Sequence, residues 1–162
     1  LLKHSIEHIM IPVSLGSKIE HVHRTKREKL LAGVCSITYP VYDNMKYDCV
    51  INNKRIQDKT CNQKSRSLYF VAMKRSYNEG DNDFYWVYFN CEKYQNIFYC
   101  IPECILVKHK LLRVRAFNLC VDNEDVINNN PRYVDFNKYK FDYANLDGSR
   151  LVKLLNDGAN AA

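Results

Sequence analysis

The sequence predicts an α/β domain in which a central β-sheet is flanked by helices. Residues 16–33 have the pattern of a helix, and Gly33 is a residue typical of helix C-termini. Several short segments rich in Val, Ile, Tyr, Phe and Thr follow, separated by turn residues. The run Phe84–Phe89 is apolar on both faces, which is typical of a strand in the middle of a sheet.

Six strands are expected after the first helix, at about residues 36–40, 46–51, 55–60, 68–73, 83–90 and 97–101. Residues 103–107 begin a short element of undetermined type. From Lys108 to Arg115, charged and apolar residues alternate, which indicates an edge strand or a basic arm. The sequence then becomes rich in Asn, Asp and Tyr, and Leu151–Leu155 is expected to form a short terminal helix.

Length and composition fit one compact domain. The chain has 162 residues, and 46% of them are hydrophobic. No stretch approaches the roughly 18 consecutive apolar residues of a membrane-spanning helix, and the first residues lack the features of a signal peptide. We therefore expect no membrane partner. The chain begins at Leu1 rather than Met, which leaves room for a leader or a longer N-terminus.

Seven cysteines are scattered through the sequence. An odd number without a signal sequence indicates reduced, mostly buried thiols and a reducing intracellular compartment. Cys91, Cys100 and Cys104 are candidate zinc ligands. Because Cys100 lies in an apolar strand segment and Pro102 separates it from Cys104, structural zinc is the minor alternative.

The net charge of +6 lies entirely in the first half of the chain. Residues 1–81 contain 14 Lys or Arg and 8 Asp or Glu, whereas residues 82–162 contain 10 of each kind. A phosphate backbone is the natural partner of such a basic surface, although ordinary solvated surface explains the charge nearly as well. Tyr133, Tyr139 and Tyr143 could stack on bases, but scattered aromatic residues in a turn-rich region more often pack under loops.

A hairpin is predicted within residues 47–60. Asn52 and Asn53 can supply the two positive φ angles of a two-residue turn. With this turn, Asp48 lies directly opposite Gln57. A turn with an odd number of residues would place them on opposite faces.

The predicted hairpin gathers three chemically distinct side chains. Lys59 falls on the face of Gln57, so a carboxylate, an amide oxygen and an ammonium group lie within roughly 5–8 Å of each other. Mg²⁺ prefers oxygen ligands and often uses only one or two protein carboxylates plus a substrate phosphate. Asp48 and Gln57 could therefore hold it, with Lys59 beside the attacking water or the scissile phosphate. An ordinary amphipathic hairpin with a polar outer face is the competing interpretation.

Four further segments accompany this hairpin in a fixed order. They are Gly16–Glu20 and Gly33–Asn44 before it, and Asp81–Tyr88 and Phe98–Pro102 after it. With the hairpin, the series resembles the core of the PD-(D/E)XK nuclease superfamily, in particular its Gln-x-Lys branch, which includes a class of intron-encoded homing endonucleases. The resemblance spans about residues 15–107. It implies a central mixed β-sheet flanked by helices, a restriction-endonuclease-like core, and one nuclease-like domain of residues 1–162 in which 108–162 form a C-terminal extension.

The resemblance also implies roles for individual residues. Glu20 matches the carboxylate of the family's first helix, Asp48 the metal-binding aspartate, Gln57 the metal-side amide and Lys59 the catalytic lysine. Glu20, Asp48 and Gln57 would hold Mg²⁺, for which Mn²⁺ can substitute. The implied protein is a Mg²⁺-dependent endonuclease that hydrolyses phosphodiester bonds of double-stranded DNA, of the homing type, and a homo-oligomer, either a dimer or a tetramer.

Two features depart from the family pattern. The helix after Glu20 is unusually basic, so Glu28 is a rival for the role of the helix carboxylate. Asp58 stands where the family mostly has an apolar residue, and the predicted register turns it to the face where a helix would pack.

Two alternative functions stay open. One is a catalytically inactive nuclease-fold protein that serves as a structural or nucleic-acid-binding component of a nucleoprotein particle, and the other is a junction-resolving nuclease.

Overall fold

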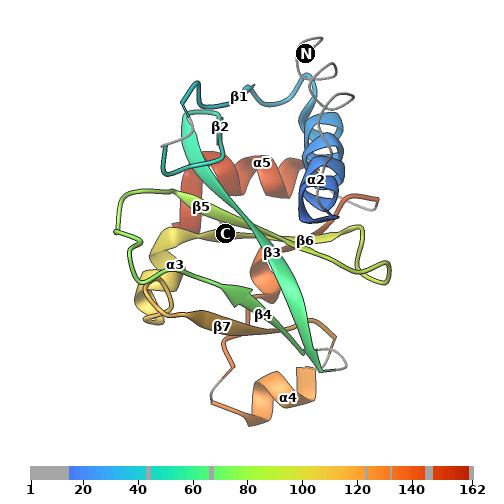
Figure 1. The fold of residues 1–162 in the computed structure, drawn as a ribbon, viewed down its shortest axis with the longest axis vertical. Helices are drawn as coiled ribbons and strands as arrows, with labels where there is room; N and C mark the ends of the chain where they lie inside the picture. The colour runs from blue at the N-terminus through green and yellow to red at the C-terminus, as the bar shows by residue number, and fades with distance from the viewer. Residues whose placement is uncertain are drawn as a thin grey trace.

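The computed structural model describes residues 15–42, 45–65, 68–122, 124–131, 133–144 and 148–160. They form a curled, mixed β-sheet with helices packed against it (Figure 1). The sheet has eight strands, in the order β1-β2-β3-β5-β6-β8, with β4 paired to β3 and β7 paired to β4. The predicted α/β fold with a central mixed sheet flanked by helices is confirmed.

The strands of the sheet are β1 (Ile37–Thr38), β2 (Cys49–Ile51), β3 (Lys54–Ser65), β4 (Leu68–Ala72), β5 (Phe84–Phe89), β6 (Ile97–Pro102), β7 (Ala116–Cys120) and β8 (Lys140–Asp142). The helices are α2 (Leu15–Leu31), α3 (Glu103–Lys108), α4 (Glu124–Asn129) and α5 (Gly148–Asp157), with short 3₁₀ turns η1 (Asn137–Tyr139) and η2 (Gly158–Asn160). No helix in these described ranges is long and apolar enough to cross a membrane.

Most elements agree with the sequence prediction within a few residues. Gly33 follows α2 with a φ of 75°, the left-handed conformation that glycine adopts without strain. Of the two interpretations of Lys108–Arg115, the edge strand is wrong, because α3 ends at Lys108 and turns follow it. Lys110 has a φ of 58°, and the Leu111 N–H donates to the Leu106 carbonyl at 2.8 Å. This helix-ending geometry is incompatible with extended backbone.

The core of the sheet is β5. All six of its residues are buried, as predicted for Phe84–Phe89. β5 runs parallel to β3 on one side and antiparallel to β6 on the other. The Trp86 ring stacks on Phe98 with ring centroids 4.4 Å apart, which adds aromatic packing to the burial.

The two faces of β3 have different neighbours. Asp58 lies beside Trp86 in the register, and the Arg27 guanidinium of α2 sits 5.1 Å from the centroid of the Trp86 ring. The face of Asp58 is therefore the face that α2 covers. Gln57 and Lys59 alternate with Asp58 and point to the other face of the sheet.

The chain after residue 107 contributes to the same sheet. β7 pairs with β4, and β8 pairs with β6. The predicted terminal helix is confirmed as α5, which buries Leu151, Leu154 and Leu155. The division of the domain into a core and a C-terminal extension stays a prediction.

Candidate active site

The hairpin turn is the one predicted. Asn52 and Asn53 have φ angles of 48° and 66°, as a turn with two left-handed residues requires. Asn52 also accepts a hydrogen bond from the Ser36 N–H at 2.9 Å, which ties the turn to the segment before β1. The predicted register is confirmed from Ile51–Lys54 to Cys49–Ile56.

Asp48 differs from the prediction in one respect. β2 begins at Cys49, so Asp48 is not a regular cross-strand partner of Gln57. Its N–H donates to the Ile56 carbonyl at 2.8 Å, and its carboxylate Oδ2 accepts the Asp58 N–H at 2.7 Å. The Asp48 side chain thus continues the hydrogen bonding of β3 at the point where the backbone of β2 leaves it.

This position is a gap between two neighbours of β3. β2 pairs with residues 54–56 of β3, and β4 pairs with residues 61–65. Among the described strands, none pairs with residues 57–60 on that edge. The carboxylate of Asp48 fills part of this gap, so a charged group reaches the sheet between two strands.

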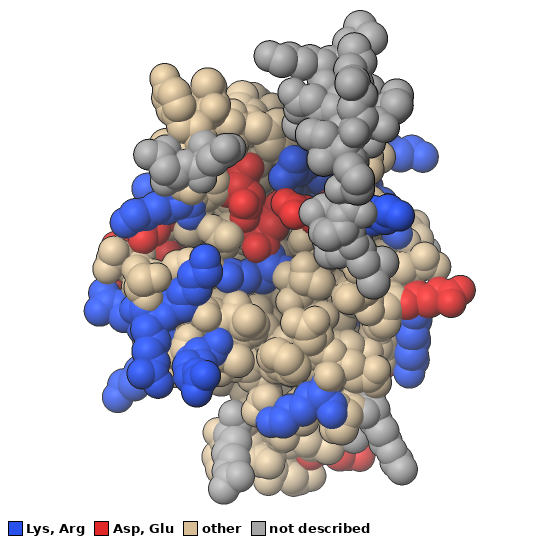
Figure 2. Space-filling model, viewed as in Figure 1, with Lys and Arg blue, Asp and Glu red and all other residues tan. Residues whose placement is uncertain are grey.

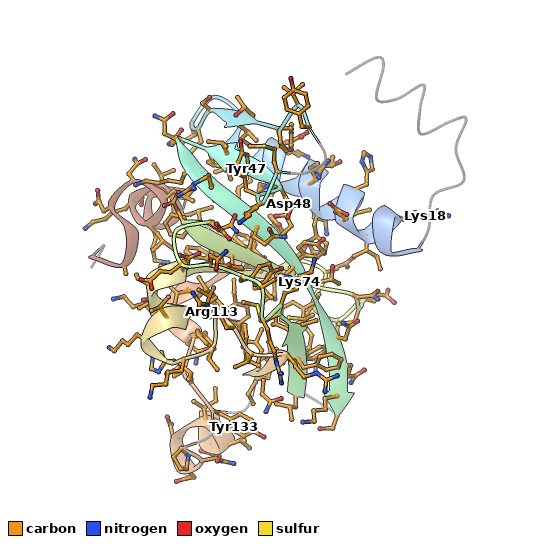
Figure 3. All side chains as sticks on the ribbon, turned by 60° about the vertical axis from the view of Figure 1, so that its left-hand side comes forward. Lys18, Tyr47, Asp48, Lys74, Arg113 and Tyr133 are labelled. Atoms are coloured by element: carbon orange, nitrogen blue, oxygen red, sulfur yellow. The ribbon has the colours of Figure 1, made fainter. Side chains whose placement is uncertain are left out.

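A polar cavity opens beside the gap, with a volume of about 500 Å³. We call it the site cavity, and it is lined by Met45, Lys46, Asp48, Gln57, Lys74, Ser76, Tyr77 and Asp81. Asp48 and Gln57 therefore share one cavity, as the sequence predicts. Figure 3 shows Asp48 and Lys74 on neighbouring parts of the same side of the molecule.

Lys59 does not itself line this cavity, but it contacts a residue of its wall. Its Nζ contacts the Tyr77 hydroxyl and is 4.6 Å from the centroid of the Tyr77 ring. Burial, together with the charge of Lys74, lowers the pKa of Lys59 to about 8, and the charge of Asp48 opposes that shift. Lys59 is thus a partly desolvated ammonium group within electrostatic reach of Asp48.

The pKa of Asp48 is shifted in the opposite direction from that of Lys59. Burial raises its pKa to about 6, the charges of Asp58 and Glu20 add to the shift, and the hydrogen bond from the Asp58 N–H opposes it. A buried carboxylate beside further carboxylates favours a bound cation, because the cation offsets their repulsion.

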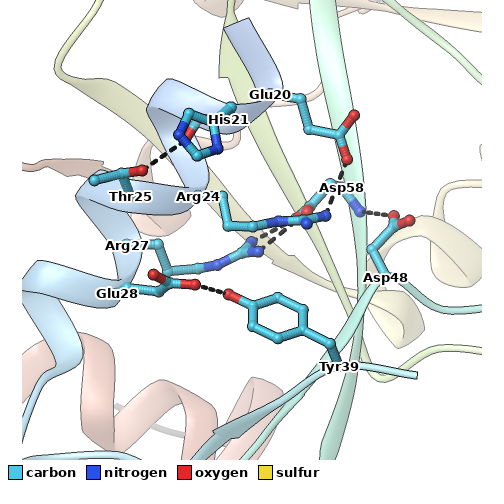
Figure 4. A network of polar contacts seen from close by, with 9 residues as sticks. All are labelled: Glu20, His21, Arg24, Thr25, Arg27, Glu28, Tyr39, Asp48 and Asp58. Atoms are coloured by element: carbon cyan, nitrogen blue, oxygen red, sulfur yellow. Dashed lines mark hydrogen bonds and ion pairs between the residues drawn. The ribbon is translucent and has the colours of Figure 1, made fainter. Parts of the chain in front are cut away.

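The structure brings Glu20, rather than Glu28, to Asp48. Glu20 accepts a hydrogen bond from Arg24 Nη2 at 3.1 Å, and its carboxylate is turned toward the stretch of β3 beside Asp48 (Figure 4). Glu20 does not itself line the site cavity. Glu28 instead accepts a hydrogen bond from the Tyr39 hydroxyl. Of the two candidates, Glu20 is the carboxylate that can face a ligand shared with Asp48.

The donor set fits Mg²⁺ better than a transition metal. In the described part of the chain, no three His, Cys, Asp or Glu side chains are grouped so that they could hold a metal by themselves. Two carboxylates and one amide oxygen are, however, a usual protein contribution to Mg²⁺, which keeps several waters and binds substrate phosphate. Glu20, Asp48 and Gln57 would supply that set, Asp48 and Gln57 from the wall of the site cavity and Glu20 from beside Asp48.

The zinc alternative finds no support in the geometry. Cys100 is fully buried in β6, whereas Cys104 is exposed on α3.

Two of the three tyrosines of the turn-rich region pack against the core, as the packing interpretation predicts. Tyr139 is buried, and the Tyr143 hydroxyl accepts the Trp86 Nε1–H at 3.0 Å.

Charge on the face that carries the site is arranged in two zones. Figure 2 shows acidic side chains gathered in the middle of this face, with Lys and Arg side chains around and below them. Lys46 and Lys74 belong to the wall of the site cavity itself. We call the Lys and Arg side chains around the acidic ones in Figure 2 the basic zone.

The site contains residues that the sequence did not single out. Tyr77, Ser76 and Asp81 come from the loop between β4 and β5 and form one wall of the site cavity. The loop is rich in Ser, Asn, Asp and Gly, which marks a turn but assigns no role. The one available signal is that this loop lies close to the predicted hairpin, because binding and catalytic residues concentrate on loops that a rigid scaffold positions.

Comparison with known proteins identifies a solved structure with a similar fold. No known family and no curated protein matches this sequence. Among solved structures, a bacterial homing endonuclease, I-Ssp6803I, is similar, with a TM-score of 0.60 and 18% sequence identity over 91% of this chain and 96% of that chain. The chain therefore has a nuclease-like fold. At this identity the likeness extends to the fold alone.

Proposed function

We propose that this protein is a Mg²⁺-dependent DNA endonuclease of the PD-(D/E)XK superfamily, in its Gln-x-Lys branch. The observation that carries the proposal is the convergence of Asp48 and Gln57 in one cavity, with Lys59 against its wall and Glu20 beside Asp48. The fold of a homing endonuclease supports the proposal and points to the homing type.

Each residue has a distinct task in this proposal. Glu20 and Asp48 are the anionic ligands of Mg²⁺, and Gln57 is a neutral oxygen ligand. When bound, the ion would polarise the phosphate and activate water. Lys59 orients the attacking water and offsets charge that develops on the phosphate, and its desolvation strengthens that interaction.

Double-stranded DNA is the proposed substrate, and the basic zone around the site is its contact surface. A homo-oligomer, either a dimer or a tetramer, would bring a second site to the second strand of the duplex. Large apolar side chains that are exposed near β1 and β2 offer a surface for it, and they include Val34, Val41, Tyr42 and Met45. Light scattering on purified protein measures the oligomeric state.

The decisive experiment compares Lys59→Ala with Lys64→Ala. Both variants remove one positive charge from β3, but Lys59 contacts Tyr77 in the wall of the site cavity, whereas Lys64 is exposed near the end of the strand. Lys59→Ala should abolish cleavage and keep DNA affinity within about tenfold, because one phosphate contact among several contributes little to binding. Lys64→Ala should cleave like wild type.

The substrates should be supercoiled and long linear DNA, together with a library from the native genome, in Mg²⁺ and in Mn²⁺. A rare-cutting enzyme can be inert on a short arbitrary duplex. If wild type and Lys59→Ala are equally inactive on the whole library, the inactive nuclease-fold component of a nucleoprotein particle replaces the enzyme. Selective cleavage of four-way junctions would instead support the junction-resolving nuclease.

A further inference from the structure

A buried ion pair joins α2 to β3 on the face of the sheet opposite to Gln57 and Lys59. Arg27 donates to both carboxylate oxygens of Asp58, from Nη1 at 2.5 Å and from Nη2 at 3.1 Å. The two side chains are only 2% and 4% exposed. Because the contact is bidentate, it restricts the orientation of both groups as well as their separation.

Asp58 connects this pair to the proposed metal ligands. In β3 it stands between Gln57 and Lys59, and its backbone N–H donates to Asp48 Oδ2 at 2.7 Å. The side chain of Asp58 therefore holds the helix, while its backbone holds Asp48. Figure 4 shows the continuous set of contacts from α2 through Asp58 to Asp48.

Glu20 lies on the same helix as Arg27, the basic partner of the ion pair. It precedes Arg27 by two helical turns, so the two residues lie on one side of α2. Sliding or rotating α2 relative to β3 would move Glu20 away from Asp48. The pair of Arg27 and Asp58 resists both movements at the site itself.

Packing alone does not require charges here. An apolar pair of similar volume often stabilises a protein at least as well as a buried ion pair, because two charges must be desolvated. What an ion pair adds is one defined geometry. Such a defined geometry is useful where a helix must hold a metal ligand at a fixed distance from a strand.

We propose that Arg27 and Asp58 are positioning residues that fix Glu20 relative to Asp48 and thereby set the affinity of the site for a divalent cation. This inference rests on the metal site of the proposed function. It does not depend on whether the protein cleaves DNA.

The test is calorimetric titration of Mn²⁺ into the DNA-free protein, with folding checked by thermal denaturation. Arg27→Lys keeps the charge and removes the fork, so Mn²⁺ affinity should fall by about tenfold, the lower end of what the loss of an outer contact of a metal site costs. The double variant Arg27→Met with Asp58→Leu keeps the net charge and an apolar contact. It should be folded and should lose Mn²⁺ affinity by a similar factor. Arg150→Lys, at an exposed position of α5, is the matched control and should bind like wild type.

The outcomes separate this inference from the proposed function. Wild-type affinity in folded Arg27→Lys and in the folded double variant would overturn the positioning role and leave the metal site intact. Absence of Mn²⁺ binding in wild type would overturn both. Mn²⁺ binding that depends on Arg27 in a protein that never cleaves DNA would support the positioning role and remove only the enzymatic function.

Discussion

The ammonium group of Lys59 lies against the hydroxyl of Tyr77, which belongs to the loop between β4 and β5. Tyr77 is itself held from both sides. Its ring packs at a tilt on Tyr85, with centroids 5.9 Å apart, and its carbonyl accepts the Arg113 Nε–H at 3.0 Å. The loop therefore gives Lys59 a fixed partner on a face of the sheet where a long, flexible side chain would otherwise move freely.

Tyr77→Phe removes this hydroxyl and keeps the ring. We expect the cleavage rate to fall about fivefold, the equivalent of one hydrogen bond of ~1 kcal/mol, with little change in DNA affinity. Tyr133→Phe is the control, because Tyr133 lies far from Asp48 (Figure 3). Equal rates for the two variants would show that the Tyr77 hydroxyl does not orient Lys59.

Asp48→Asn should stabilise the protein at about pH 7 while removing metal-dependent activity. The pKa of Asp48 is raised to about 6 in the folded protein, above the ordinary value of about 4. The folded state thus binds this proton more tightly than the unfolded chain, and the charged carboxylate lowers the free energy of unfolding increasingly as the pH rises from about 4 to about 6. Asparagine keeps an acceptor for the Asp58 N–H without the charge.

The expected gain is about 1–3 kcal/mol at neutral pH, and it should disappear near pH 4. Thermal unfolding of wild type and variant across this range measures it. Asp157→Asn, at an exposed position of α5, should change nothing. A gain that is the same at every pH would mean that the charge of Asp48 is not its cause.

DNA binding should depend steeply on salt. Each phosphate that the basic zone neutralises adds about −0.9 to the slope of log affinity against log salt concentration, so several contacts give a slope steeper than about −2. Lys74→Ala should reduce the slope by about one, because Lys74 belongs to the wall of the site cavity. Fluorescence anisotropy with a labelled duplex measures both. Binding that ignores salt would favour a protein partner over DNA.

The turn of the hairpin should tolerate glycine and reject β-branched residues. Asn53→Val places a branched side chain at a φ of 66°, and the left-handed conformation should cost about 1–2 kcal/mol. Asn53→Gly should be neutral or slightly stabilising, since Asn-Gly is the preferred pair for this turn. Asn62→Val, on an exposed position of β3, is the control. Denaturant unfolding measures all three, and equal stability would contradict the assigned turn strain.

The hairpin register could be predicted from the sequence because its determinants are local. Two residues that accept positive φ fix the turn, and the turn fixes which side chains share a face. The same register correctly turned Asp58 toward the helix. The exact place of Asp48 cannot be predicted, because the first residue of β2 depends on the direction from which the preceding chain approaches the sheet.

The partner of the Asp58 carboxylate also cannot be predicted from neighbouring residues. Arg27 lies 31 residues earlier in the sequence, and a basic helix is usually a solvated helix. Only the packing of α2 on the sheet shows that one of its arginines is fully buried. Likewise, alternation from Lys108 to Arg115 indicates an edge strand or a basic arm, whereas the left-handed Lys110 makes the start of this segment a helix-ending turn.

The parallel pairing of β3 with β5 has a consequence for the newly made protein. Glu20, Asp48, Gln57 and Lys59 all precede residue 60, but the strand that carries two of them is registered against Phe84–Phe89. A nascent chain that has exposed only its first 60 or so residues holds every proposed ligand and lacks the strand that orders them. We therefore expect metal binding to begin only after β5 has left the ribosome.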